Sequence, residues 1–147
     1  MVAKPTTPEK NTMKLLTLSL LTLGLTAMQT MAADKAETRV FELRTYTAPP
    51  GKMKDLHARF RDHTCKLLEK HGMTLVGFWT PADPKGAEET LVYIVAHPSE
   101  EAAKKAWDSF RKDADWLKVK AESEKNGPIV SKVEVKFFNS TDYSKIK

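Results

Sequence analysis

His57, His63 and His71 follow one another along a single predicted helix, downstream of a short strand that carries Arg44 and Tyr46. A histidine beside a cavity can act as a general base, because its ordinary pKa lies close to neutrality. An arginine or a tyrosine next to it could then stabilise a developing oxyanion. This combination would suit a small enzyme that acts on an aromatic or otherwise apolar substrate.

The same histidines admit two other interpretations. His63 or His71 could be the axial ligand of a haem, whereas a histidine packed in the core or at a helix rim is the commoner case. No other cofactor is expected. The intervals between neighbouring histidines are six and eight residues. A helical zinc site uses ligands about four residues apart, and the helix has no carboxylate-rich cluster, so the sequence predicts no metal site.

We expect the functional side chains to line an apolar pocket under the first helix. Polar groups on a buried helix face need partners, because leaving one unpaired costs about 1–3 kcal/mol. A cavity, a polar network or a partner subunit over this helix would supply them. A binding or structural role for the pocket ranks first, catalysis second and haem binding third. The candidate pocket residues are Arg44, Tyr46, His57, His63, His71, Phe78, Trp79, Trp107 and Trp116.

The first strand and helix are predicted from the spacing of their apolar residues. A strand at about 40–46 places Glu42, Arg44 and Tyr46 on one face, which would be either a charge pair over an aromatic ring or a solvated surface. The helix runs over about 52–71 and ends at a glycine. Its apolar stripe consists of Met53, Leu56, Phe60, Leu67 and Leu68.

Two further strands, at 74–80 and 90–96, are apolar on both faces, which is typical of strands covered on both sides. Gly77 predicts a bulge or a close backbone approach in the first of them. The segment 81–86 between them is predicted to be a polar surface loop. The last strand, at 129–138, alternates apolar and charged residues as an edge strand would.

A second helical region, between the third and fourth strands, begins after Ser99, which is a good N-cap. The order β-α-β-β-α-β is that of a ferredoxin-like α+β fold, an antiparallel sheet with helices on one face. The other face of the sheet would be bare and apolar, which is an aggregation hazard. We therefore expect two chains to stack these faces as a symmetric homodimer.

The N-terminal residues have the pattern of a secretory signal peptide. An uncharged run over 15–27 follows Lys14 and is too short to span a bilayer, which takes about 20 apolar residues. Small residues place cleavage after Ala32, and Met13 is a more natural start than Met1. A mitochondrial transit peptide, the alternative, would be richer in arginine. The predicted organisation is an upstream extension at 1–12, a signal peptide over 1–32, a linker at 33–39 and a domain at 40–144, secreted or periplasmic and without an integral membrane segment once cleaved.

Charge and cysteine content exclude two further possibilities. The net charge is +5, but it is spread along the chain without a block of basic residues, so no nucleic-acid partner is expected. Cys65 is the single cysteine, so no disulfide can form within the chain. A packed or half-exposed role suits it better than a reactive one.

Over about 40–144 the sequence resembles the NIPSNAP family, within the dimeric α/β-barrel superfamily. That resemblance implies a homodimer in which two four-stranded sheets close a barrel with the helices outside, and it brings no established reaction. Relatives in the superfamily include cofactor-independent monooxygenases and haem-binding enzymes, so the resemblance implies a small cofactor-independent monooxygenase or isomerase, or a haem-binding protein, as the alternative to a binding domain. The sequence departs from the family pattern at Ala114 and Asp115, where an Asp-Pro-Glu-Trp step is usual, and at Asn139-Ser140. The residues that carry the resemblance are Glu42-Leu43-Arg44-Thr45-Tyr46, Pro50-Gly51-Lys52, Phe60, His63-Thr64, His71-Gly72-Met73, Gly77-Phe78-Trp79, Trp107, Asp113, Asp115-Trp116 and Thr141-Asp142-Tyr143.

Overall fold

The computed structural model describes Met1 and residues 39–147. The predicted signal peptide, its cleavage site after Ala32 and almost all of the linker lie outside the described residues. Within 39–147 no helix has the length and apolar character needed to cross a membrane. The elements are β1 (Val40–Thr47), α1 (Met53–Arg59), the π-helical segment η1 (Phe60–Thr64), α2 (Cys65–Lys70), β2 (Thr74–Trp79), α3 (Pro84–Glu89), β3 (Thr90–His97), α4 (Glu100–Lys112), α5 (Ala114–Ser123) and β4 (Lys132–Asn139).

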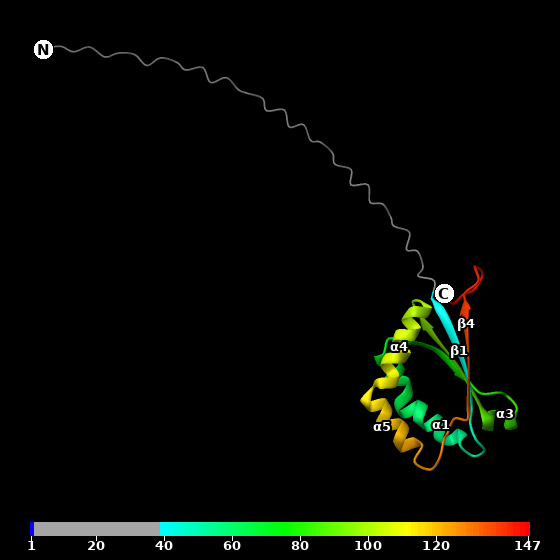
Figure 1. Cartoon of the computed structure of the whole chain (residues 1–147). Helices are drawn as coiled ribbons and strands as arrows, with labels where there is room; N and C mark the ends of the chain where they lie inside the picture. Colours follow the sequence, from blue (N-terminus) through cyan, green and yellow to red (C-terminus); the bar gives the residue numbers. More distant parts are fainter. Residues whose placement is uncertain (2–38) are drawn as a thin grey trace. The chain divides into compact units, whose positions relative to one another are not determined.

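The four strands form one antiparallel sheet in the order β2-β3-β1-β4. The helices α1, α4 and α5 lie on one side of this sheet (Figure 1). Together with the chain order of the elements, this arrangement confirms the predicted ferredoxin-like α+β fold. β2 and β4 are the two edge strands, and the last strand is therefore an edge as its alternation predicted.

The apolar stripe of the first helix forms the centre of the core, as its spacing predicted. Leu56, Phe60 and Leu68 are buried in one cluster with Tyr93 and Val95 of β3. The recurrence of apolar residues every three or four positions puts them all on the side of the helix that faces the sheet. The cluster is completed by Ala48, Met53, Leu67, Met73, Leu91, Trp107, Phe110 and Ile129.

The first helix is not regular over its whole length, which corrects the prediction of one helix at 52–71. Its middle turn, η1, is π-helical, and the Thr64 hydroxyl donates a 3.1 Å hydrogen bond to the carbonyl oxygen of Arg59 across that turn. A single widened turn barely disturbs the apolar spacing, so the sequence pattern did not reveal it. Gly72, with φ +79°, ends the helix as predicted.

Two other predicted boundaries are wrong. The supposed loop at 81–86 leads into α3, because the Asp83 carboxylate caps the helix at the backbone N–H of Gly86 and Pro84 occupies the first turn. The last strand begins at Lys132 rather than at 129. Ile129 is fully buried in the core, so its apolar character serves packing there and not strand pairing.

The face of the sheet without helices carries apolar side chains, as the two-sided strands predicted. Register places Leu43, Val92 and Ile94 on this face, where they are half-buried, together with Trp79, which is 50% exposed. The pairing of β2 with β3 shifts at Gly77, which confirms the predicted bulge. A Cβ atom at Gly77 would lie 2.6 Å from the Trp79 ring, so only glycine lets the indole lie across the strand.

Candidate functional site

A buried carboxylate lies on the helix-covered face of the sheet. Glu42 of β1 is 1% exposed, and its Oε2 lies 2.6 Å from Trp107 Nε1 of α4 and 2.9 Å from His97 Nε2 of β3. Arg44 Nε lies 3.5 Å from Glu42 Oε1, and the guanidinium group is 3.9 Å from the centre of the Trp107 ring. We call these four residues the buried polar cluster. They join two strands to the helix layer.

The environment of Glu42 keeps it ionised. Burial raises the pKa of Glu42, but the hydrogen bonds with His97 and Trp107 and the charge of Arg44 outweigh burial and lower that pKa below its ordinary value. The first strand therefore carries a charge pair over an aromatic ring. The alternative of a solvated strand face is wrong, because this face is covered by helices.

Tyr46 and Tyr93 belong to an aromatic cluster in the core. The Tyr93 hydroxyl donates a 3.0 Å hydrogen bond to the Tyr46 hydroxyl, and the two rings meet edge to face at 5.3 Å. Phe78 stacks on Tyr93 with ring centres 5.4 Å apart, and Phe60 lies 5.2 Å away on another side. Burial raises the pKa of Tyr93 well above its ordinary value, so its hydroxyl keeps its proton at neutral pH.

A hollow of about 350 Å³ lies beside β2, at the first helix. His57, Phe78 and Trp79, three of the expected pocket residues, meet there. Burial, followed by the charge of Glu69, raises the pKa of the Cys65 thiol, which makes it a weak nucleophile at neutral pH. Four of the eight residues that line the hollow have aromatic rings, namely His57, Phe60, Phe78 and Trp79. The lining of this cavity, which we call the β2 hollow, is His57, Phe60, Arg61, Cys65, Phe78, Trp79, Thr80 and Leu91.

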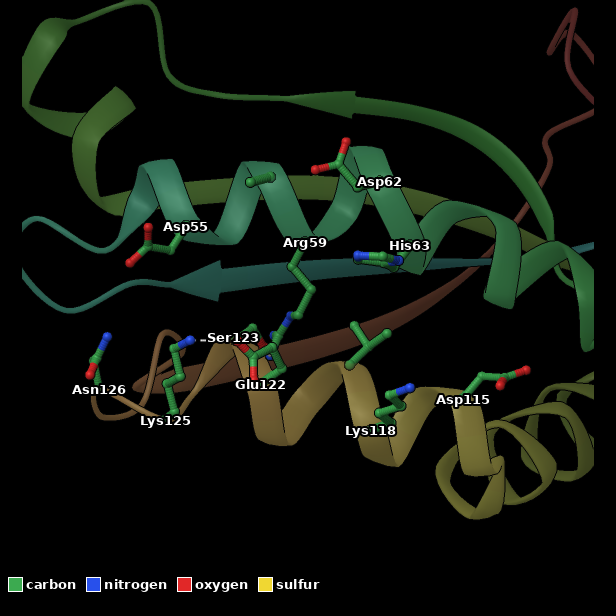
Figure 2. Close-up of a pocket in the computed structure, with 12 residues that line it drawn as sticks. Asp55, Arg59, Asp62, His63, Asp115, Lys118, Glu122, Ser123, Lys125 and Asn126 are labelled. Atoms are coloured by element: carbon green, nitrogen blue, oxygen red, sulfur yellow. Dashed lines mark hydrogen bonds and ion pairs between the residues drawn. The ribbon is translucent and has the colours of Figure 1, made fainter.

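A larger groove of about 660 Å³ runs between the first helix and α5 (Figure 2). His63 lies in its lining, so this histidine opens onto a different cavity from His57. Arg59 extends from the first helix towards α5, where its Nη1 donates a 2.8 Å hydrogen bond to Glu124. The lining mixes acidic and basic side chains, including Asp115 on α5. It therefore offers no single charge for a ligand to match.

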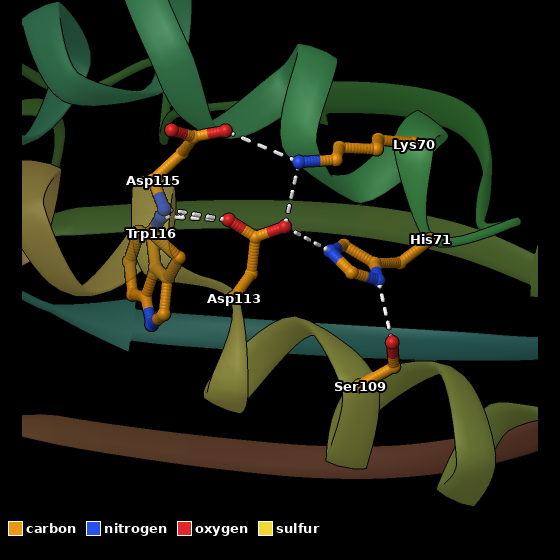
Figure 3. Close-up of polar contacts among 6 residues, drawn as sticks. All are labelled: Lys70, His71, Ser109, Asp113, Asp115 and Trp116. Carbon is orange, nitrogen blue, oxygen red and sulfur yellow. Dashed lines mark hydrogen bonds and ion pairs between the residues drawn. The ribbon is translucent and has the colours of Figure 1, made fainter.

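His71 is held by two partners where the end of α2 meets the corner between α4 and α5 (Figure 3). Its Nδ1 lies 2.8 Å from Ser109 Oγ and its Nε2 lies 2.8 Å from Asp113 Oδ2. Lys70 Nζ lies 2.8 Å from the same Asp113 oxygen. Both ring nitrogens of His71 are therefore engaged. We call these four residues the Asp113 clamp.

The contacts of the clamp explain its electrostatics. Hydrogen bonds with Lys70 and His71, together with the backbone N–H of Trp116, hold the pKa of Asp113 well below its ordinary value. Serine, histidine and aspartate are in contact here, as in hydrolytic triads. In this clamp, however, a lysine shares the carboxylate, and the same Asp113 side chain caps α5. The Asp113 clamp therefore connects the end of α2 to α4 and to the start of α5.

The structure thus distributes the expected pocket residues over several places. Trp116 packs on Phe110, with ring centres 4.5 Å apart, and lies below the Arg59 guanidinium. The predicted pairing of a histidine base with Arg44 or Tyr46 at one cavity is not formed within residues 39–147, because those two side chains lie in the core. Nor do the described residues assemble three or more metal-binding side chains at one point. Two groups of three do come together: His57, Phe78 and Trp79 in the β2 hollow, and Arg44 with the rings of Tyr46 and Trp107 in the core.

Several residues of these sites were not singled out from the sequence. His97 follows the strand predicted at 90–96 and has no signal of its own in the sequence, although the register of β3 against β1 brings it beside Glu42. Ser109 and Lys70 carry no local signal, since both lie on polar helix surfaces. The buried arginine Arg59 could have been found, because it follows the apolar stripe of its helix at positions 56 and 60.

A family model described as NIPSNAP matches residues 41–145 of the chain. The chain belongs to the NIPSNAP family. A NIPSNAP family protein of unknown function from Agrobacterium tumefaciens has a similar structure, with 18% identity, a TM-score of 0.65, and coverage of 76% of this chain and 96% of the other. A NIPSNAP-like domain protein from Burkholderia xenovorans has 13% identity, a TM-score of 0.63, and coverage of 74% and 90%. No curated protein sequence matches significantly.

The NIPSNAP assignment confirms the resemblance seen in the sequence, and the solved structures confirm the fold alone. The departure at Ala114 does not disturb the local turn of this NIPSNAP chain. Asp113 caps α5 by accepting hydrogen bonds of 2.8 Å and 3.1 Å from the backbone N–H groups of Asp115 and Trp116. The helix starts at Ala114 without the proline that the family usually has there.

Proposed function

We propose that this NIPSNAP protein is an exported homodimeric binding domain that holds a small apolar ligand in the β2 hollow. The observation that carries the proposal is the meeting of His57, Phe78 and Trp79 in one cavity whose lining is half aromatic. Ligand sites are typically concave, mostly apolar and supplied with a few polar groups, and about 300 Å³ is the lower end of their usual size. The β2 hollow fits that description.

The lining of the β2 hollow indicates the chemistry of the ligand. Phe60 and Phe78 meet edge to face with ring centres 5.8 Å apart, and together they give the hollow an aromatic surface against which a planar, aromatic-sized molecule could pack. Arg61 and His57 bring polar groups into the same lining. A weakly acidic aromatic compound would satisfy both the apolar walls and the arginine.

Dimerisation and export are supported by separate observations. The helix-free face of the sheet exposes Trp79 beside half-buried aliphatic residues, and a second copy of the chain would cover it. The uncharged run after Lys14 supports passage through a membrane and cleavage after Ala32. A protein partner on this face is the alternative to a second copy.

The first experiment is native mass spectrometry of the mature protein purified from its own host. A dimer that carries a bound aromatic molecule would support the proposal. In parallel, the fluorescent aromatic anion 8-anilinonaphthalene-1-sulfonate can be titrated into the purified protein. Trp79→Ala should weaken its binding about tenfold, whereas Leu117→Ala, at an exposed apolar residue of α5, should leave it unchanged. Equal binding by both variants would contradict the proposed site.

A further inference from the structure

A further hollow, of about 470 Å³, lies where the end of α2 meets β3 and α4. We call it the corner hollow. It shares no lining residue with the β2 hollow or with the groove between the first helix and α5. The proposed apolar ligand therefore leaves it unused. The lining of the corner hollow is Lys70, His71, Gly72, His97, Pro98, Ala102, Lys105, Ala106 and Ser109.

The ionisable residues of this lining are all basic, and no carboxylate lies among them. The groove beside α5, by contrast, is lined by acidic and basic side chains together. A cavity with ionisable side chains of one sign attracts ligands of the opposite sign, so the corner hollow is suited to an anion. Its basic residues are Lys70 and His71 at the end of α2, His97 of β3 and Lys105 of α4.

His97, which lines the corner hollow, has a ring nitrogen without a partner. The residue is 1% exposed, and its Nε2 lies 2.9 Å from Glu42 Oε2. Because Glu42 is ionised and can only accept, Nε2 carries the hydrogen of that bond. The other ring nitrogen, Nδ1, is buried and has no hydrogen-bond partner within residues 39–147. Buried polar atoms are rarely left in this way, which points to a partner from outside the chain.

The surroundings of His97 allow its ring to carry a second proton. Glu42 on β1 supplies a negative charge at Nε2, and Arg44 Nε lies 3.5 Å from the other oxygen of that carboxylate. With His97 doubly protonated, the two cations exceed the single carboxylate by one charge. An anion in the corner hollow would balance that charge and accept from Nδ1–H. Anion binding should therefore be accompanied by uptake of a proton.

The two lysines of the hollow differ in how far they are already engaged. Lys70 Nζ is shared between two carboxylates, the nearer of which is 2.8 Å away in Asp113 (Figure 3). Lys105 is exposed and forms no ion pair within the described part of the chain. Both ring nitrogens of His71 are engaged in the Asp113 clamp. The donors left for an anion are therefore His97 and Lys105.

We propose that the corner hollow binds the phosphate group of a small molecule, held by His97 Nδ1–H and by the ammonium group of Lys105. A phosphate group offers acceptor oxygens in several directions, which suits donors that come from two elements, whereas a carboxylate offers two oxygens in one plane. The hollow also has room for the organic part of such a ligand, since ligand pockets begin at about 300 Å³. This site does not depend on the proposed function of the β2 hollow.

Sulfate is the first probe, because it is a tetrahedral oxyanion that does not itself titrate near neutral pH. Isothermal titration calorimetry of the full chain, in two buffers of different ionisation enthalpy, measures the sulfate affinity and the proton uptake together. The expected result is saturable binding with uptake of about one proton for each sulfate. Inorganic phosphate should also bind, and acetate should bind about fivefold more weakly than sulfate.

Variants of the two donors locate the site. Lys105→Gln should weaken sulfate binding about fivefold, because it removes the unpaired charge. Lys104→Gln, the same change at the neighbouring exposed position of α4 outside the lining, is the matched control and should leave the affinity unchanged. His97→Gln keeps an N–H group for Glu42 but cannot take up a proton, so the proton uptake should disappear. Lys105→Gln tests the site even where His97→Gln lowers the stability of the domain.

Several results would overturn the inference. One is the absence of sulfate and phosphate binding at concentrations of up to about 20 mM. Another is an equal loss of affinity in Lys104→Gln and Lys105→Gln, which would assign the binding to general surface charge. Binding that neither Lys105→Gln nor His97→Gln changes would place the anion elsewhere, and acetate binding as tight as that of sulfate would contradict the phosphate assignment. The titration with 8-anilinonaphthalene-1-sulfonate tests the β2 hollow separately, so the failure of one proposal is distinguishable from the failure of the other.

Discussion

The indole Nε1 of Trp107 donates a 2.6 Å hydrogen bond to the carboxylate of Glu42, so the helix layer is tied to the sheet by a buried charge. The carboxylate also meets His97 from the neighbouring strand and Arg44 from its own. A buried charge is tolerated only when it is paired and hydrogen-bonded, and Glu42 is both. The buried polar cluster therefore fixes how α4 sits on the sheet.

Glu42→Gln should destabilise the domain by about 2–4 kcal/mol, because it removes one member of a buried ion pair and leaves Arg44 without its countercharge. The measurement is the free energy of unfolding from urea titration. Glu134→Gln, the same change at an exposed position of β4, is the matched control and should cost less than about 0.5 kcal/mol. Similar losses in both variants would contradict a stabilising role for the cluster.

The same carboxylate should contribute to acid sensitivity. Its pKa is lowered in the folded state, so its stabilisation is present above the ordinary glutamate pKa of 4.5 and is lost as the pH falls through the folded value. The Glu42→Gln variant has no carboxylate to protonate, so it cannot lose this stabilisation as the pH falls. Unfolding measured from pH 7 downwards should therefore show a smaller decline in stability for the variant than for the wild type below about pH 5. Parallel profiles would show that Glu42 titrates equally in both states.

Gly77→Ala should displace the Trp79 indole, since the added methyl group would lie 2.6 Å from the ring. We expect a change in tryptophan fluorescence and a stability loss of about 1 kcal/mol. In a Trp79→Ala background the same substitution should cost less, because the clashing ring is gone. A double-mutant cycle measures this coupling. If the free-energy losses of Gly77→Ala and Trp79→Ala simply add, Gly77 is required by the conformation of the backbone and not by the Trp79 ring.

The sequence predicted the features that each segment encodes by itself. The three- and four-residue spacing of Leu56, Phe60 and Leu68 predicted the core face of the first helix, and the two-sided apolar strands predicted a bare sheet face. The alternation of β4 predicted an edge strand. These three features depend on which side chains of an element are buried. Buried positions recur every three or four residues in a helix and every second residue in a strand, so the sequence of one element is enough to predict them.

The contacts between distant segments could not be predicted in this way. His97 and Glu42 are 55 positions apart and meet only because of the register of β3 against β1. Sequence proximity groups His71 with the other histidines, whereas its partners are Ser109 on α4 and Asp113 between α4 and α5, after two further strands. Hydrophobic periodicity and secondary-structure propensity carry no information on strand register or on how helices pack. The contacts that form the site were therefore visible only in the structure.

Thr64→Val should test the π-helical turn. The Thr64 side chain is buried, and its hydroxyl donates to the Arg59 carbonyl group across η1. Valine keeps the shape but removes the donor, so a loss of about 1–2 kcal/mol in unfolding free energy is expected. Thr80→Val, at an exposed position after β2, controls for the loss of a hydroxyl group. Unchanged stability in Thr64→Val would mean that the turn is set by the surrounding packing.

The Asp113 clamp can be separated from the helix cap that shares its aspartate. Asp113→Asn keeps an oxygen that can accept the N–H groups of Asp115 and Trp116, but it removes the charge that faces Lys70 and His71. Asp113→Ala removes both. Alanine should therefore destabilise the domain more than asparagine does, and the difference between the two variants measures the cap alone.

The pH dependence then isolates the charge. Because the pKa of Asp113 is held well below its ordinary value, its stabilisation is present above about pH 4 and is lost as the pH falls towards the folded value. Asp113→Asn should decline less than the wild type over that acid range. Lys70→Gln should also reduce the decline in stability over that acid range, because Lys70 is the main cause of the lowered pKa of Asp113. A Lys70→Gln profile that follows the wild type would assign the shift to His71 and the backbone N–H groups instead.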